Sequence, residues 1–260
     1  MLEGVIFDVD GTLVDSNDVH AQSWVDTFAE AGYSVPFEVV RPLIGMGADK
    51  LLPKTIGIRH DSEAGKKLTE RRSEVFRKSY LPHLRPLRGS RALVLRVRED
   101  GLNAIVATSA KDEQLKGLLK AAEVEDLMEE KATASDAKRS KPDPDIVDAA
   151  IEKSGVSPRN LVMIGDTPYD IEAATRAGVR IIAFRSGGWD DDSLKGAAEI
   201  YDGPEDLLSH YDTSLLGKKG RVTSLTSPLQ VVAQTAHQMG PPGGGPEVQA
   251  DRQDLPTPKQ

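Results

Sequence analysis

The chain has 260 residues, of which 38% are hydrophobic, enough for one large domain or for a core with a smaller insert. Its formal net charge of −8 offers no positive field to a nucleic acid, and the absence of cysteine excludes disulfides, zinc–thiolate sites and thiol nucleophiles. Because no basic leader and no apolar stretch of roughly 18–20 residues occurs, we expect a cytoplasmic protein without a nucleic-acid or membrane partner.

Four short apolar runs, rich in β-branched residues, predict β-strands at residues 5–7, 103–108, 161–164 and 180–184. The amphipathic segments around them predict helices at residues 90–100, 111–122, 144–154 and 169–177. Strands that alternate with helices form parallel βαβ units, and uninterrupted apolar strands indicate a sheet that is covered on both faces. We therefore predict an α/β fold built on a doubly wound, Rossmann-like parallel sheet.

The interval from residue 16 to residue 86 breaks this alternation, because its pattern is helical throughout. Helices are predicted at residues 19–31, where Trp24, Val25 and Phe28 share one face, and at residues 38–43, 48–55 and 62–80. We interpret residues 16–86 as an all-helical insert in a core made of residues 1–15 and 87–211. Residues 212–260, which are rich in Pro and Gly, are predicted to form a disordered tail.

Polar residues follow the predicted strands where each one ends, and in parallel sheets this edge is where ligands bind. The residues concerned are Asp8, Asp10, Thr108, Ser109, Asp166 and Asp170, joined by Lys141 from a proline-stiffened loop. Carboxylates that cluster in a cleft of low dielectric constant repel one another unless a cation lies between them. Oxygen ligands without any soft donor favour Mg²⁺, which also accepts phosphate oxygens as ligands.

These residue types suit phosphoryl transfer. Asp8 and Asp10 share one face of an extended strand, so both can reach the same substrate. We expect Asp8 to attack phosphorus and form an aspartyl-phosphate, while Asp10 first protonates the leaving oxygen and then deprotonates the attacking water. Lys141 and the hydroxyl of Thr108, with Ser109 beside it, would bind the phosphate.

The chain resembles the haloacid dehalogenase superfamily of phosphotransferases over residues 1–211. The resemblance rests on four motifs that occur in order: D-x-D-G-T at residues 8–12, a strand ending at Thr108, K-P-x-P at residues 141–144 and G-D-x-x-x-D at residues 165–170. It implies a helical cap inserted after the first motif. It also implies that Mg²⁺ is bound by the side chains of Asp8 and Asp166 and by the backbone carbonyl of Asp10, with Asp170 supporting the water shell of the metal.

Asp10 in the first motif and residues 44–49 in the helical insert favour one branch of this superfamily. Asp10 favours phosphate over haloacid chemistry, and Ala48 occupies the position where β-phosphoglucomutases carry an arginine. The run I-G-M-G-A-D at residues 44–49 is instead similar to phosphoglycolate phosphatases. We expect a Mg²⁺-dependent phosphatase of a small phosphorylated metabolite, either phosphoglycolate or a sugar phosphate. The alternatives are a β-phosphoglucomutase-like phosphotransferase and a non-catalytic phosphate-binding scaffold.

Further candidate contacts with the substrate lie in the insert. They are His20, for which a packed or solvent-facing position on its helix is the favoured interpretation, Gly47, and the cations of Arg41, Lys50 and Lys54, which could reach the remote end of the substrate. Closure of the insert over the site would exclude bulk water, so we expect hinges near residues 15–18 and 82–88. The sequence leaves the natural substrate and the oligomeric state open.

Overall fold

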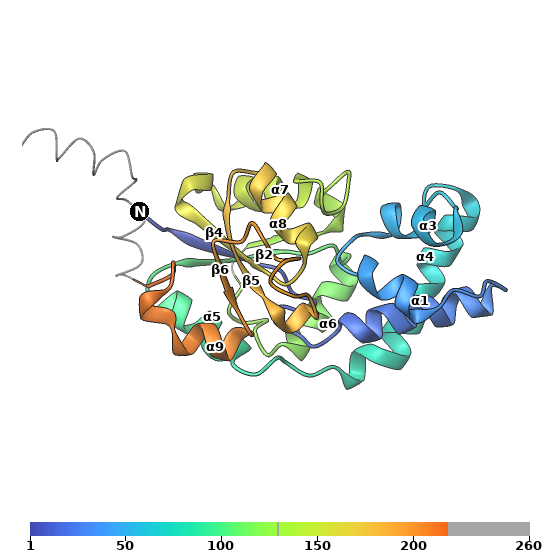
Figure 1. The fold of residues 1–260 in the computed structure, drawn as a ribbon, viewed down its shortest axis with the longest axis horizontal. Helices are drawn as coiled ribbons and strands as arrows, with labels where there is room; N and C mark the ends of the chain where they lie inside the picture. Colours follow the sequence, from blue (N-terminus) through green and yellow to red (C-terminus); the bar gives the residue numbers. More distant parts are fainter. Residues whose placement is uncertain (129, 218–260) are drawn as a thin grey trace, which may run out of the picture. The chain divides into compact units, whose positions relative to one another are not determined.

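The computed structural model describes residues 1–128 and 130–217. Its core is a six-stranded parallel sheet in the order β3-β2-β1-β4-β5-β6 (Figure 1). The strands are β1 (Gly4–Phe7), β2 (Asn103–Ala107), β3 (Glu130–Ala132), β4 (Leu161–Gly165), β5 (Arg180–Phe184) and β6 (Glu199–Tyr201). The chain order reverses at β1, which lies between β2 and β4, so the predicted doubly wound fold is confirmed.

Helices cover both faces of this sheet. One face carries α5 (Ser90–Glu99), α6 (Asp112–Ala121) and α9 (Pro204–Ser209), and the other carries α7 (Asp145–Ser154) and α8 (Pro168–Arg176) (Figure 1). Side chains alternate along β1, so Val5 and Phe7 pack with the first group of helices and Ile6 packs with the second. Burial on both faces explains why the central strands are almost entirely apolar.

All four predicted strands are present, but two further strands escaped prediction. β3 and β6 are three residues long and lie at the two edges of the sheet. Glu130 and Lys131 in β3, and Glu199 in β6, interrupt any apolar run. Short edge strands with charged residues are common in natural sheets because they resist pairing with other chains. The same shortness kept α9 from being predicted.

The interval between β1 and α5 is helical, as predicted. It contains α1 (Asn17–Glu30), α2 (Phe37–Val40), α3 (Ala48–Ile56) and α4 (Glu63–Val75), with 3₁₀ turns at Arg41–Leu43 and Leu81–His83 and a π-helical turn at Phe76–Tyr80. Trp24 and Phe28 on α1 pack with Leu51, Leu52 and residues of the other cap helices in a small hydrophobic cluster of their own. We call this insert the cap. It packs with the sheet domain as one compact unit.

The two linkers between cap and core lie side by side. Val14 forms an antiparallel bridge with Pro86, and the N–H of Asp15 donates to the carbonyl of Arg85 at 3.1 Å. The N–H of Leu87 donates in turn to the carbonyl of Leu13 at 3.0 Å. The segments in which we expect hinges are therefore hydrogen-bonded to each other.

The end of the described chain requires a correction. Tyr211–Thr213 form a 3₁₀ turn, and Ser214 and Leu216 are fully buried, so the predicted start of a disordered tail at residue 212 is wrong. The burial of Leu216 in the main hydrophobic cluster explains why this segment is folded. The rest of the predicted tail, residues 218–260, lies outside the described residues.

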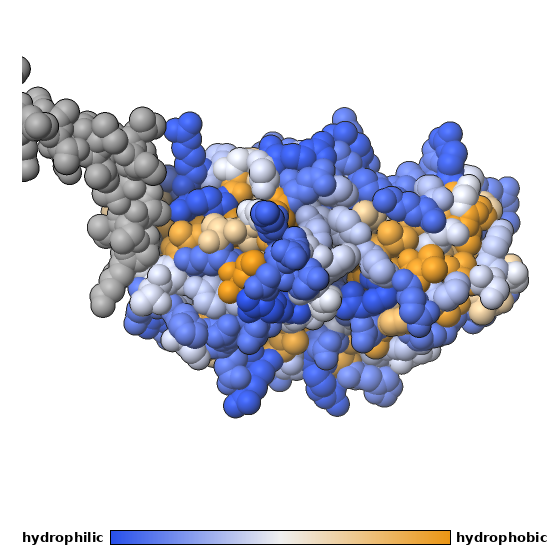
Figure 2. All heavy atoms as spheres, in the orientation of Figure 1, coloured by the Kyte–Doolittle hydropathy of each residue, from blue (hydrophilic) through white to orange (hydrophobic). Residues whose placement is uncertain are grey.

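Figure 2 shows hydrophilic residues over most of one face, with hydrophobic residues in patches over both core and cap. Among the helices of residues 1–128 and 130–217, none is long and apolar enough to cross a membrane.

Candidate active site

The loop after β1 begins the site. Asp8 lies directly beyond the strand, and Gly11 has a φ of +73°, which favours glycine. A Cβ atom on Gly11 would lie 2.2 Å from Oδ2 of Asp166, so the absence of a side chain lets the loop approach that carboxylate. The hydroxyl of Thr12 then donates to Oδ1 of Asp166 at 2.9 Å. Gly11 and Thr12 thus bring the loop after β1 into contact with Asp166, which directly follows β4.

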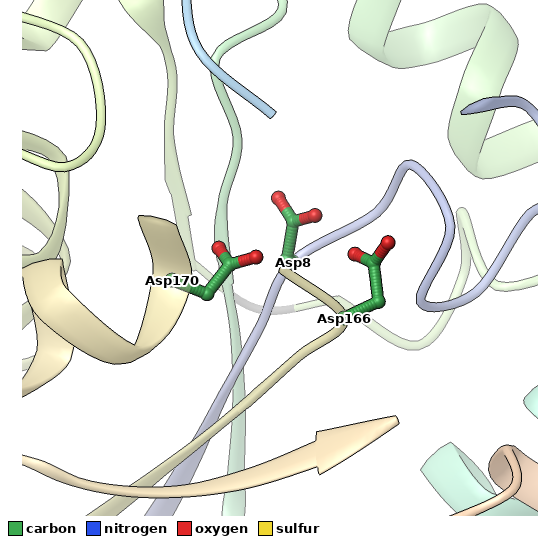
Figure 3. Close-up of side chains that lie close together, drawn as sticks. All are labelled: Asp8, Asp166 and Asp170. Atoms are coloured by element: carbon green, nitrogen blue, oxygen red, sulfur yellow. The ribbon is translucent and has the colours of Figure 1, made fainter. Parts of the chain in front are cut away.

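Three buried carboxylates converge at this edge of the sheet. Asp8, Asp166 and Asp170 each offer an oxygen, and these oxygens lie within 4.8 Å of one another (Figure 3). Asn17, in the first turn of α1, donates to Oδ2 of Asp166 at 2.7 Å. Thr167 caps α8 and donates to Oδ2 of Asp170 from its N–H at 3.1 Å and from its hydroxyl at 2.6 Å. Hydrogen bonds from Thr12, Asn17 and Thr167 therefore fix the orientation of Asp166 and Asp170.

Lys141 reaches this cluster from the loop before α7. Its Nζ lies 2.6 Å from Oδ1 of Asp8 and 2.7 Å from Oδ1 of Asp170, and its side chain is only 2% exposed. Burial by itself would lower the pKa of Lys141, but the carboxylates of Asp170 and Asp8 outweigh burial and raise this pKa above its ordinary value. Lys141 is thus a fixed positive charge between two acids.

One lysine does not balance three buried carboxylates. Burial, opposed by Lys141 and reinforced by Asp170 and Asp10, raises the pKa of Asp8 to about 7. Burial and the charges of Asp170 and Asp8 likewise raise the pKa of Asp166 well above its ordinary value. A divalent cation among these oxygens would remove the repulsion, and the cluster offers only the hard oxygen ligands that such a cation prefers. The residues present therefore fit a divalent metal.

Asp10 lies apart from the carboxylate cluster, in contact with the cap. Its Oδ1 accepts hydrogen bonds from Ser16 at 2.7 Å and from Nε2 of His20 at 2.6 Å. Arg72 on α4 donates to Nδ1 of the same imidazole, which leaves the imidazole proton on Nε2, facing Asp10. The ring of His20 stacks on Phe76 with a centroid distance of 4.2 Å. The structure thus places His20 against Asp10.

The pKa values of Asp10, His20 and Arg72 are all shifted by this arrangement. Burial would raise the pKa of Asp10, but His20, Ser16 and Arg72 together lower it. Burial lowers the pKa of His20 and, to about 10, that of Arg72. Arg72 was not predicted as a site residue, because one arginine in a highly charged helix carries no local signal that it is partly buried beside His20.

Thr108 and Ser109 follow β2, beside the loop of Asp8. Thr108 is buried, and its hydroxyl accepts a hydrogen bond from the N–H of Ala110 at 3.1 Å. The hydroxyl of Ser109 is buried and has no hydrogen-bond partner among the described residues. A buried hydroxyl without a partner is unusual, and a phosphate oxygen would satisfy it.

The other predicted contacts of the cap bind protein groups in this structure. The N–H of Gly47 donates to Oγ of Ser140 at 2.9 Å. Arg41 donates to the carbonyl of Gly187 at 2.8 Å, and Lys50 lies 2.6 Å from Oδ2 of Asp143. Lys54 is exposed. Gly47, Arg41 and Lys50 thus tie the cap to loops of the core.

Comparison with known proteins agrees with the fold and the geometry of this site. The haloacid dehalogenase-like hydrolase family matches residues 5–184, and the chain belongs to this family. It is therefore an enzyme of the hydrolase class that acts on phosphate esters, a phosphatase of the haloacid dehalogenase type.

Three similar proteins illustrate the relationship. A phosphoglycolate phosphatase from Nitrosospira multiformis is 27% identical over 72% of this chain and 84% of its own. An N-acetylmuramic acid 6-phosphate phosphatase from Pseudomonas aeruginosa is also 27% identical, over 82% of this chain and 96% of its own. The crystal structure of a hydrolase from Pseudomonas syringae matches with a TM-score of 0.74 and 28% identity, covering 81% of this chain and 98% of that one.

Proposed function

We propose that this protein is a Mg²⁺-dependent phosphatase that hydrolyses a small phosphorylated metabolite through an aspartyl-phosphate on Asp8. The observation that carries the proposal is the position of Asp8, a buried carboxylate held 2.6 Å from Lys141 Nζ beside two further carboxylates. An aspartate that served only as a polar surface residue would need neither burial nor a lysine and two carboxylates beside it. The names of the two phosphatase relatives favour phosphoglycolate or a sugar phosphate as the class of substrate.

In the first step, a carboxylate oxygen of Asp8 attacks phosphorus and forms a new P–O bond, while the bond from phosphorus to the leaving oxygen breaks. Asp10, entering this step protonated, gives its proton to the leaving alcohol. Lys141 and the free hydroxyl of Ser109 bind the phosphoryl oxygens and offset their charge.

In the second step, a water molecule attacks the phosphorus of the aspartyl-phosphate. Asp10 accepts a proton from this water, and the bond from Asp8 to phosphorus breaks to release inorganic phosphate. Asp8, Asp166 and Asp170 would hold the magnesium ion, together with the backbone carbonyl of Asp10. When bound, the ion supplies positive charge beside the phosphoryl group and keeps Asp8 ionised.

The two alternatives account for less of the site. A β-phosphoglucomutase-like enzyme would need a cation for a second phosphate, and Ala48 stands at the position concerned. A non-catalytic scaffold would have no use for Asp8, Asp166 and Asp170 held together at the cost of electrostatic repulsion.

Substitution of the nucleophile tests the proposal. Wild-type protein with Mg²⁺ should release phosphate from p-nitrophenyl phosphate, and mass spectrometry of acid-quenched protein should find a phosphoryl group on Asp8. The Asp8→Asn variant should lose both signals, whereas Asp18→Asn, which alters an exposed acid of the cap, should keep them. Undiminished turnover in Asp8→Asn would overturn the proposal.

A further inference from the structure

The loop that carries Lys141 is held by two sets of partners, one from the core and one from the cap. The core set acts at the far end of the loop. Arg139 and Arg176 lie 3.2 and 3.1 Å from Oδ1 of Asp143, and Arg176 also donates to the carbonyl of Pro142 at 3.3 Å. Both arginines belong to the core, so these contacts involve no cap residue, although Lys50 of the cap also lies 2.6 Å from Oδ2 of Asp143.

The cap set acts on Ser140, directly before Lys141. Asp49, in the first turn of α3, accepts hydrogen bonds from the hydroxyl of Ser140 at 2.5 Å and from its N–H at 3.2 Å. The N–H of Gly47 donates to the same hydroxyl, and Lys50 donates to the carbonyl of Ser140 at 2.5 Å. The hydroxyl, N–H and carbonyl of Ser140 thus all bind cap residues.

Close packing accompanies these hydrogen bonds. A Cβ atom on Gly47 would lie 2.7 Å from Cβ of Ser140, so a larger residue at position 47 would push the cap away from the loop. The side chains of Asp49 and Lys50 are each 21% exposed. Their hydrogen bonds to Ser140 therefore lie in a partly buried interface. Hydrogen bonds that are partly shielded from water hold geometry better than exposed ones.

We propose that Asp49 is a positioning residue for catalysis. By fixing Ser140 when the cap is closed, its carboxylate holds Nζ of Lys141 between Asp8 and Asp170. Opening the cap releases Ser140, so Lys141 is fully placed only when the cap covers the substrate. This inference rests on the proposed role of Lys141 in phosphate binding, and it assigns the cap an action on catalysis in addition to enclosing the site.

Two variants and a matched control test the inference. In Asp49→Ala, kcat for p-nitrophenyl phosphate should fall about 10- to 100-fold with KM within about twofold, because a small displacement of a catalytic group costs rate at this scale. In Asp49→Asn, which keeps one acceptor oxygen for Ser140, the loss should be smaller. Glu70→Ala, which removes an exposed acid on α4 of the cap, should leave kcat unaltered.

Two further measurements separate positioning from a general loss of structure. Combining Asp49→Ala with Ser140→Ala should lower kcat no further than the stronger single change, because both remove one hydrogen-bonded unit. Amide hydrogen exchange at Ser140 should accelerate in Asp49→Ala while exchange in β1 stays slow.

The exchange measurement needs no turnover, so it tests the inference even if Asp8→Asn contradicts the proposed function. Unchanged kcat in Asp49→Ala, additive effects in the double variant, or unchanged exchange at Ser140 would each overturn the inference.

Discussion

Asp10 receives two hydrogen bonds on one oxygen. Ser16 and His20 both donate to Oδ1, and no described residue donates to Oδ2. Oδ2 is therefore the oxygen that can exchange a proton with a leaving group or a water. The lowered pKa of Asp10 favours the carboxylate form, which accepts a proton in the second step of the proposed mechanism, whereas the first step uses the protonated form of Asp10.

Removing the imidazole of His20 should make Asp10 less effective in proton transfer. In His20→Ala, Asp10 loses a donor but remains present, and we expect kcat to fall about 10- to 100-fold, less than the loss of a general acid–base group itself would cost. Steady-state kinetics with p-nitrophenyl phosphate would measure the change. His60→Ala, at an exposed histidine of the cap, is the control, and equal rates in the two variants would contradict a role for His20 in supporting Asp10.

At the scale of the element, the first cap helix has two functions. The N-terminal turn of α1 contributes Asn17 to Asp166 and His20 to Asp10, while the following turns bury Trp24 and Phe28 in the hydrophobic cluster of the cap. The packing of α1 within the cap therefore also determines where its first turn presents these polar groups to the core.

Shortening Phe28 tests how much the hydrophobic cluster of the cap contributes to stability. Phe28 is fully buried, so Phe28→Ala should lower the free energy of unfolding by about 3–5 kcal/mol, measured by urea denaturation. Val25→Ala, at a half-buried position of the same helix, should cost less. A cost for Phe28→Ala no larger than that for Val25→Ala would show that the cap cluster contributes little to stability.

Elements also show how far the sequence could predict this structure. The central strands and the clustering of Asp8, Lys141 and Asp166 could be predicted because buried parallel strands are apolar and their carboxyl ends meet at one edge. The contacts of Arg72 with His20 and of Asp49 with Ser140 could not. They depend on how the cap docks on the core, and no short-range pattern encodes that docking.

At the scale of the whole molecule, the carboxylate cluster links stability to pH and metal. Burial raises the pKa of Asp8 from 3.8 to about 7, so without metal the folded state binds more protons than the unfolded state between these values. Its contribution to stability therefore falls as the pH rises through this window. Above pH 7 the ionised cluster is ready for a cation, whereas below it protons compete with the metal.

Magnesium should consequently stabilise the protein more at pH 8 than at pH 6. Differential scanning calorimetry with and without Mg²⁺ would show a larger rise in Tm at the higher pH. Asp166→Asn, which removes one proposed ligand, should lose most of the rise at both pH values. A rise that is independent of pH, or that survives in Asp166→Asn, would argue against metal binding at this cluster.

The pairing of Val14 with Pro86 has a consequence for how such enzymes could diversify. The polypeptide departs from the sheet domain and returns to it at neighbouring backbone positions, so a replacement module of another size could be spliced there without displacing β1 or α5. Such a graft must retain the residues up to His20, since Asn17 and His20 support the acids beneath. Whole-module exchange could thus redirect an unchanged reaction centre to new metabolites in a single genetic event.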